Sequence, residues 1–182
     1  MTQVQAQALH VVRPKVSTRI LAEAALLVAL SSVLYYLKLY TFPQGGSITL
    51  GGMIPVLMFA LRRGPRVGII AGAIFGFVVL YQEPFIYNPV QVLLDYPLAF
   101  GALGLAGFFS KNPIVGVGAG IFGRFVAHFL SGVIFFASFS PPGTPATVYS
   151  AIYNGSYLSV ELIVSAAVMF MLLKRRILKI YL

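Results

Sequence analysis

Apolar residues gather along this chain in long runs, and short polar or Gly- and Pro-rich segments separate the runs. Six such runs occur, at about residues 17–37, 48–61, 67–80, 90–109, 114–139 and 148–173. A helix needs about 20 apolar residues to cross the roughly 30 Å of hydrocarbon in a bilayer. The run at 48–61 is short and suits a tilted or re-entrant helix. The pattern therefore predicts an all-α membrane protein, a bundle of six transmembrane helices.

The two ends of the chain differ from these runs in being polar. Residues 1–16 mix Gln, Thr, His and Arg without an apolar centre, so they do not resemble a cleaved secretory signal. Residues 174–182 are rich in Lys and Arg. We therefore divide the chain into a polar tail at 1–16, a membrane domain at 17–173 and a basic tail at 174–182.

The positions of the basic residues predict the orientation of the bundle. They fall at the N-terminus, after the second and fourth runs and at the C-terminus, as Arg13, Lys15, Arg19, Arg62, Arg63, Arg66, Lys111, Lys174, Arg175, Arg176 and Lys179. All of these regions lie on one side of a six-span protein, and cytoplasmic loops retain Lys and Arg. Both termini are therefore expected in the cytoplasm, and the net charge of +9 needs no nucleic-acid partner.

Composition and missing motifs exclude several classes of protein. Hydrophobic residues make up 59% of the chain and charged residues 9%, whereas a soluble domain has about a quarter charged. The chain has no cysteine, no phosphate-binding loop and no H-E-x-x-H or G-x-S-x-G motif, and its two His residues lie far apart. We expect no enzyme, no catalytic residue, no metal site and no cofactor. Energy for ATP-driven transport would have to come from other subunits.

Charged residues inside the apolar runs are the first candidates for function, because a charge in hydrocarbon is costly unless it faces a cavity or a partner. The candidates are Asp95, Arg124, His128 and Glu161. Asp95 can hold a cationic or amino-bearing ligand; alternatively it pairs with Arg124 or stabilises the start of a helix. Glu161 is interpreted as a helix-packing or ion-pair residue.

Spacing places several polar residues on shared helix faces. Arg124 and His128 are four residues apart, and Gly132 continues their face. The His128 ring can stack on a flat ligand or satisfy a hydrogen bond between helices, and Arg124 is expected to hold a carboxylate or this His. Tyr149 and Asn154 are separated by about 140° around a helix, so one cavity can take both only at the edge of that helix.

Seven segments in order carry a resemblance to a known family: RILAEAALLVAL at 19–30, PQGGSITLGGMIP at 43–55, LRRG at 61–64, LLDYPLAF at 93–100, GLAG at 104–107, RFVAHFLSG at 124–132 and YSAIYNG at 149–155. Together they resemble the thiamine-specific substrate-binding subunits (S-components, the ThiT family) of energy-coupling-factor (ECF) vitamin transporters. The likeness runs from about residue 17 to 174. It implies a six-helix bundle of the ECF S-component type in a prokaryotic plasma membrane, with a thiamine pocket near the outer face that the loop between spans one and two closes.

The resemblance also implies roles for individual residues. Asp95 would bind the aminopyrimidine, Tyr149 and Asn154 would complete its polar recognition, and His128 would contact the ring system. Tyr96 and Gly132 would line the same pocket. Family members often stack the vitamin on tryptophan, and Phe136 stands where one is expected. Some members also have an acidic residue where this chain has Leu50.

Partners follow from the same resemblance. Ala25 and Ala29 lie one turn apart on the first span and form a strip of small residues that suits close helix approach. In the family such a strip contacts a coupling transmembrane subunit, which works with two cytoplasmic ATPases. The alternatives left open are a related ligand, such as hydroxymethylpyrimidine or another flat vitamin like riboflavin, and a proton-coupled secondary transporter that uses Asp95, Glu161 and His128 as a relay.

Overall fold

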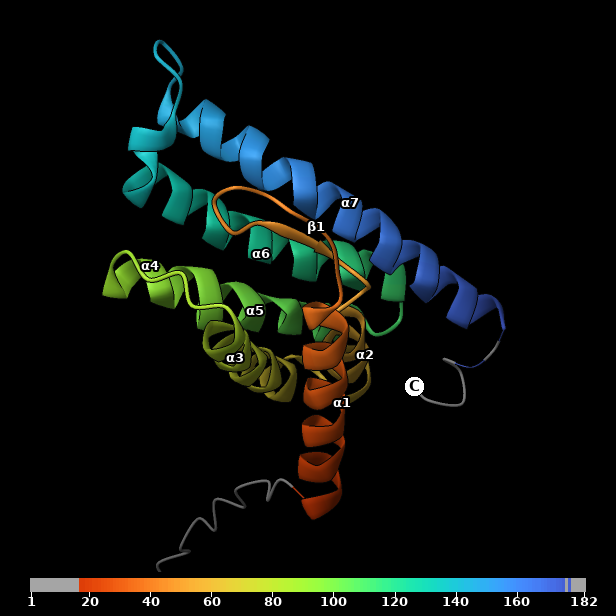
Figure 1. The fold of residues 1–182 in the computed structure, drawn as a ribbon. Coiled ribbons are helices and arrows are strands. Elements are labelled where there is room, and N and C mark those ends of the chain that lie inside the picture. The colour runs from red at the N-terminus through yellow and green to blue at the C-terminus, as the bar shows by residue number, and fades with distance from the viewer. Residues whose placement is uncertain (1–16, 176, 178–182) are drawn as a thin grey trace, which may run out of the picture.

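The computed structural model describes residues 17–175 and residue 177. The predicted polar tail at 1–16 and residues 176 and 178–182 of the predicted basic tail lie outside the described residues. Figure 1 shows the described part as a bundle of helices with a small β-hairpin.

Four long helices form where the sequence has uninterrupted apolar runs. They are α1 (Thr18–Tyr36), α3 (Pro65–Gln82), α6 (Pro113–Phe135) and α7 (Ala146–Lys174). Both α3 and α6 begin with proline, which is tolerated there because the first N–H groups of a helix have no partner within it. A short 3₁₀ turn, Ala137–Phe139, follows α6, so the fifth predicted run is a helix to Phe135 and a separate turn beyond it.

The fourth predicted run forms a helix of irregular geometry. It consists of α4 (Pro89–Leu93), a π-helical turn (Leu94–Leu98), α5 (Ala99–Gly101) and a 3₁₀ stretch (Ala102–Phe109). Pro97 lies within the π turn; it has no N–H to donate, and its ring would crowd the carbonyl of the preceding turn in a regular α-helix. Asp95 lies in this turn, so the backbone irregularity falls at a candidate site residue.

The second predicted run forms a shorter helix than the others. Helix α2 (Ile54–Arg63) has 10 residues and is mostly buried, and a helix of that length covers only about 15 Å. Five helices in the described part of the chain are long and apolar enough to cross a membrane: Thr18–Tyr36, Pro65–Gln82, Pro89–Phe109, Pro113–Phe135 and Ala146–Lys174. The structure is thus mostly helical, with five candidate spans and a short buried helix.

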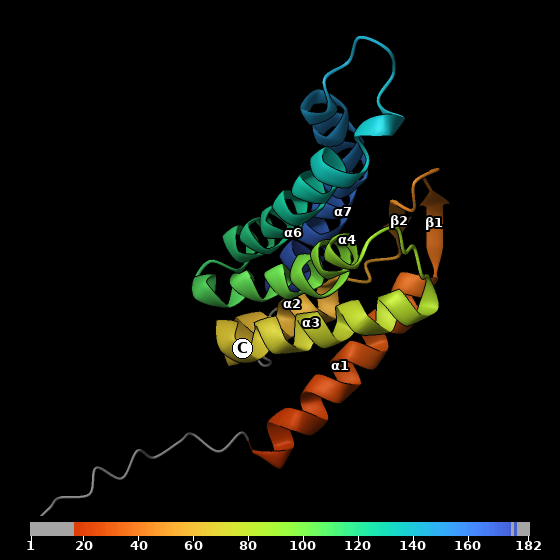
Figure 2. The ribbon, with the colours of Figure 1, turned by 90° about the vertical axis from the view of Figure 1, so that its left-hand side faces the viewer.

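A two-stranded antiparallel hairpin precedes α2, and it is the part of the fold that the all-α prediction missed. Strands β1 (Lys38–Thr41) and β2 (Ser47–Thr49) pair with Lys38 opposite Thr49, and Gly45 has a φ of 87° in the turn. Figure 2 shows the two strands beyond the end of α1 and beside α4. From Thr49 the chain enters the interior, where residues 51–53 are buried.

Small residues bring the helices into close contact. A Cβ atom on Gly72 of α3 would overlap the carbonyl of Phe100. One on Gly120 of α6 would lie 2.9 Å from the carbonyl oxygen of Leu103. Glycine at these positions lets α3 and α6 pack directly against the backbone of the fourth helix.

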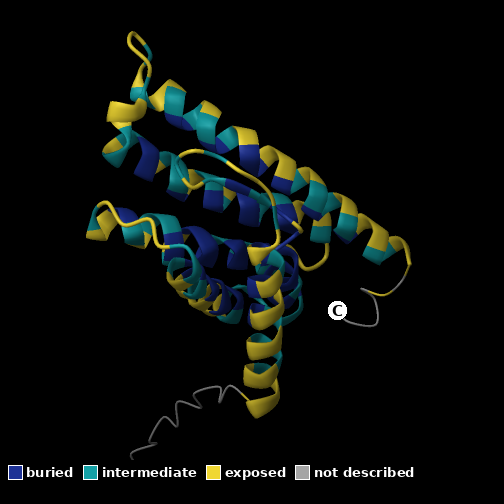
Figure 3. Cartoon of the chain, viewed as in Figure 1, coloured by how far each residue is buried: buried dark blue, intermediate teal, exposed yellow. Residues whose placement is uncertain are grey.

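Burial is uneven across the bundle. Figure 3 shows α2 and the inner faces of α6 dark blue, whereas α1 is largely yellow along its length. The N-terminal half of α1 is tied to the C-terminal end of α2. Glu23 accepts a hydrogen bond of 2.8 Å from Arg63 Nε and also pairs with Arg62. Ala25 and Ala29, the predicted partner-contact residues, are exposed on α1.

Candidate functional site

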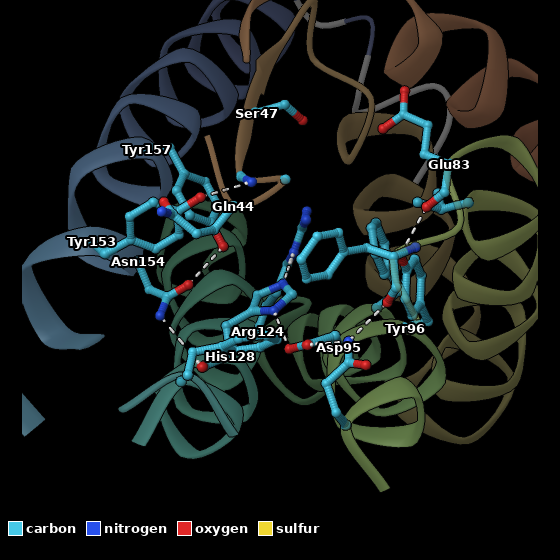
Figure 4. Close-up of a pocket in the computed structure, with 18 of the residues that line it drawn as sticks. Gln44, Ser47, Glu83, Asp95, Tyr96, Arg124, His128, Tyr153, Asn154 and Tyr157 are labelled. Carbon is cyan, nitrogen blue, oxygen red and sulfur yellow. Dashed lines mark hydrogen bonds and ion pairs between the residues drawn. The ribbon is translucent and has the colours of Figure 1, made fainter. Parts of the chain in front are cut away.

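A cavity of about 350 Å³ opens at one end of the bundle, a size typical of small-molecule sites. All seven residues predicted to bind a ligand line it: Asp95, Tyr96, His128, Gly132, Phe136, Tyr149 and Asn154. They come from the start of the fourth helix, the end of α6 and the start of α7, and Figure 4 shows several of these side chains converging on the same space. Their role in binding stays a prediction, but their placement in a single cavity is a finding.

The chain path explains why these residues meet. The chain reverses direction from α3 to the fourth helix, from that helix to α6, and from α6 to α7. The end of α3, the start of the fourth helix, the end of α6 and the start of α7 therefore fall at the same end of the bundle. The basic residues predicted to be cytoplasmic, where the structure describes them, lie at the other helix ends: Arg62 and Arg63 end α2, Arg66 begins α3, and Lys174 ends α7. The cavity and the basic residues therefore occupy opposite ends.

Asp95 is held by three protein groups. Its Oδ2 accepts hydrogen bonds of 2.8 Å from Gln91 Nε2 and 2.8 Å from the Ser131 hydroxyl, and its Oδ1 lies 2.9 Å from His128 Nδ1. An ionised carboxylate has about four acceptor positions, so these contacts fix its orientation and leave one position for a ligand donor. The sequence left open an ion pair between Asp95 and Arg124. In the structure Asp95 pairs with His128 instead.

Arg124 fixes the protonation pattern of His128. Its Nε donates to His128 Nε2 at 3.2 Å, and since Arg only donates, that ring nitrogen accepts. His128 Nδ1 then carries the proton and donates to Asp95. Both ring nitrogens are engaged by protein, so His128 offers a ligand its face and not its edge. The expectation that Arg124 holds this His is confirmed, and its guanidinium lies 4.0 Å from the centre of the Phe100 ring.

Asn154 and Gly132 shape the wall where α6 meets α7. Asn154 donates to the Ser150 carbonyl at 3.0 Å and to the His128 carbonyl at 3.3 Å, and it accepts from the Tyr157 hydroxyl at 2.9 Å. These bonds occupy its amide donors, and Oδ1 keeps a second lone pair with which it can accept. A Cβ atom on Gly132 would overlap the Ser150 hydroxyl, so glycine permits this close approach.

The aromatic residues surround the cavity on several sides. Tyr96 donates its hydroxyl to the Glu83 carbonyl at 2.7 Å and accepts from the Phe85 amide at 2.8 Å, so its polar end secures the loop after α3. Phe136, directly after α6, packs at 5.8 Å between ring centres against Phe85. Tyr149 stacks on Tyr153 of α7 with ring centres 6.0 Å apart.

Sequence reasoning missed other residues that line the cavity. Gln91, on α4, is buried; besides holding Asp95 it accepts from the Tyr87 amide at 3.0 Å, which orders the loop before the helix. A single uncharged Gln in a mostly apolar run gave no signal in the sequence. Other missed positions lie in the hairpin, directly after α3 and within α7, among them Lys38, Gln44, Gly45, Gly46, Ser47, Glu83, Tyr153 and Tyr157.

The hairpin forms one wall of the cavity and rests on α7. The Tyr153 hydroxyl accepts a hydrogen bond of 3.0 Å from the Gly46 amide in the turn. Phe42 of the same turn packs against the Tyr153 and Tyr157 rings with centres 6.0 and 5.9 Å away. The segment between the first two predicted spans therefore lies over the cavity, where the family resemblance implied a closing loop.

Glu161 lies away from the cavity lining. It accepts hydrogen bonds from both the amide and the hydroxyl of Thr49, the latter at 2.7 Å. The interpretation of Glu161 as a packing residue agrees with this contact between α7 and β2. Among the described residues, no cluster of three or more His, Cys, Asp or Glu side chains could hold a metal ion.

The fold and the cavity define a class: a multi-pass membrane protein with a polar, aromatic-lined ligand cavity at one end of its helix bundle. A family model described as "Thiamine transporter protein (Thia_YuaJ)" matches residues 21–180. The chain belongs to this thiamine transporter family, which confirms the family indicated by the sequence motifs and the multi-pass membrane location.

Named relatives support the same assignment. The thiamine transporter ThiT of Bacillus subtilis is 36% identical over 149 residues, with 72% of this chain and 77% of the relative covered. ThiT of Lacticaseibacillus paracasei is 30% identical over 156 residues, with coverage of 75% and 77%. The solved structure of ThiT from Listeria monocytogenes superposes with a TM-score of 0.78 at 28% identity, covering 86% of this chain and 94% of that one.

Proposed function

We propose that this protein is the substrate-binding membrane subunit that captures thiamine from outside the cell for ATP-driven uptake by an ECF transporter. The observation that carries the proposal is a single cavity lined by an oriented acid, Asp95, and by aromatic faces. Relatives named as thiamine transporters add weight to thiamine as the ligand.

The chemistry of thiamine suits such a cavity. The molecule joins a flat aminopyrimidine to a permanently cationic thiazolium ring. Asp95 offers an acceptor to the amino group, and the face of His128 offers a stacking surface. Phe136 and Tyr149 supply further aromatic faces, where each cation–π contact is worth about 0.5–2 kcal/mol.

The proposal includes an orientation in the membrane. A six-helix bundle with α2 as its short second helix would place the cavity toward the outside and both termini in the cytoplasm. The basic residues at the opposite end of the helices support this, because cytoplasmic ends retain Lys and Arg.

The direct test is a calorimetric titration of the purified protein with thiamine, hydroxymethylpyrimidine and riboflavin. Thiamine is expected to bind most tightly. Preference for the pyrimidine alone would redefine the protein as a binding subunit for that ligand, and Phe136 in place of a larger aromatic makes this the second candidate. Thiamine uptake by proteoliposomes that contain this chain alone would instead identify a secondary transporter.

The partner surface is part of the proposal. Ala25 and Ala29 are exposed on α1, a small-residue strip open to a helix of a coupling subunit. Ala25→Trp should leave thiamine binding by the isolated protein intact and abolish uptake by cells that contain the coupling subunit and its two ATPases. Ile163→Trp, on the exposed face of α7, is the matched control and should keep both. Equal uptake by the two variants would contradict a contact at Ala25.

A further inference from the structure

A second charged pair lines the same cavity, separate from Asp95 and His128. Lys38, the first residue of β1, forms an ion pair with Glu83, the residue directly after α3. Their side chains keep 21% and 27% of their surface exposed, more than the 12% of His128 and 15% of Asp95. The pair therefore joins the hairpin to the bundle from within the ligand cavity.

The backbone of Glu83 is fixed by hydrogen bonds, whereas its carboxylate is held by the ion pair with Lys38. The Glu83 carbonyl accepts from the Tyr96 hydroxyl at 2.7 Å, and its amide donates to the Val79 carbonyl at 2.8 Å. Figure 4 shows the carboxylate directed away from the Tyr96 hydroxyl and apart from Asp95. The cavity thus presents two carboxylates at different places on its wall.

The partners of these carboxylates differ in how readily they can be exchanged. Asp95 is held by three fixed groups, one of them His128, which Arg124 also holds. Glu83 pairs with a lysine, whose ammonium sits on a flexible four-carbon stem and can move to solvent. A partly exposed ion pair is worth only about 0–1 kcal/mol. A ligand cation can therefore replace Lys38 beside Glu83 at small cost.

We propose that Lys38 and Glu83 form a second subsite that reads the charge of the ligand. Glu83 takes the cationic heteroaromatic ring, and Lys38 is the internal cation that this ring displaces. The inference rests on the proposed function, since it assumes that the amino-bearing ring lies at Asp95 and the cationic ring at the other end of one ligand.

The test compares two ligands of the same shape, thiamine and its analogue in which a neutral thiophene replaces the thiazolium. The purified wild-type protein should prefer thiamine. Glu83→Gln should weaken thiamine binding about tenfold, as loss of one charge-assisted contact does, and should leave the neutral analogue within about twofold, so that the preference disappears. Lys38→Gln should tighten thiamine binding about threefold, because the competing cation is gone.

A matched control removes a carboxylate from an ion pair outside the cavity. Glu23→Gln at the other end of α1 should leave the affinity for both ligands unchanged. Equal weakening of thiamine and its neutral analogue by Glu83→Gln would reduce the pair to a structural tie of the hairpin and overturn the proposal. An unchanged or weakened thiamine affinity in Lys38→Gln would overturn it too. Failure of the wild-type protein to bind thiamine at all would instead refute the proposed function.

Discussion

Asp95 and Glu161 are both acids within membrane-crossing helices, and their surroundings differ in a way that separates their roles. Asp95 lies in a π-helical turn and faces a cavity, where side chains of Gln91, Ser131 and His128 orient it. Glu161 lies in the regular helix α7 with 2% of its surface exposed, and its Oε2 has no hydrogen-bond partner among the described residues. One acid is open to a ligand, and the other is enclosed by the protein.

The difference in surroundings follows from the hydrogen-bond donors that each acid accepts from. Irregular backbone at membrane depth is tolerated only where protein groups or a water-filled cavity satisfy its N–H and C=O groups. The chain between β2 and α2 has irregular backbone and is mostly buried in the protein. There Glu161 accepts from the amide and hydroxyl of Thr49, whose hydroxyl in turn accepts from the Gly52 amide at 3.1 Å. An acid in a span can therefore serve the backbone of its own protein as well as a ligand.

The largest effect is expected from removing the enclosed acid. Glu161→Ala leaves the buried Thr49 amide and hydroxyl without their acceptor, at about 1–3 kcal/mol for each unsatisfied group. Thermal unfolding of the purified protein in detergent should show a clear loss of stability, and Glu161→Gln, which keeps an acceptor, should lose less. Ser165→Ala is the matched control one turn further along α7, because its buried hydroxyl has no partner among the described residues. A stable Glu161→Ala protein with weakened thiamine binding would contradict the structural role of Glu161 and assign it to ligand binding instead.

Asp95→Asn should affect ligand binding and not stability, the reverse of what is expected for Glu161→Ala. The change removes the charge, keeps the volume and should weaken thiamine binding at least about tenfold, or about 1.4 kcal/mol, with little change in thermal unfolding. Titration calorimetry and thermal unfolding of the same preparation give both numbers. Unchanged affinity would return Asp95 to a purely structural role, in which it orients His128.

The sequence could predict the oriented acid but not its surroundings. Asp95 and His128 stood out because a charge inside an apolar run is costly, and their placement on neighbouring helices follows from the alternating direction of the spans. Gln91 carried no such signal. Lys38 and Glu83 lie just outside the apolar runs, where charges are ordinary, so only the folded chain reveals that they meet.

The fold was predictable where apolar runs were long and uninterrupted. Strands of four and three residues, as in β1 and β2, are too short to show an alternating pattern. The mostly buried segment at residues 49–53 depends on Glu161, more than a hundred positions away along the chain. A long-range partner of this kind leaves no local trace, so the second span is predicted as a helix although its first part is not helical.

Phe136 allows a test of whether an aromatic ring of the cavity stacks on bound thiamine. Phe136→Ala should weaken thiamine binding by roughly 1–3 kcal/mol through lost stacking and burial, and Phe136→Trp should keep or tighten it because indole is the better cation–π surface. The introduced tryptophan would be the first in a chain that has none, so its fluorescence reports on the cavity alone. Emission that ignores saturating thiamine would place this ring outside the binding surface.

The smallest effect is expected from weakening the contact between the turn of the hairpin and α7. Glu161 secures the base through Thr49, whereas in the turn the Gly46 amide donates a hydrogen bond to the Tyr153 hydroxyl of α7. Tyr153→Phe removes that bond and keeps the ring, at about 0.5–1.5 kcal/mol. If the hairpin closes over bound thiamine, stopped-flow measurements should show dissociation faster by about 2- to 12-fold.

Tyr81→Phe, at a fully peripheral tyrosine of α3 that is 89% exposed, is the control, and thiamine should dissociate from it as from the wild type. Equal rates for the two variants would mean that this hydrogen bond of the turn does not set how long the ligand stays, and that the other contacts of the hairpin hold it.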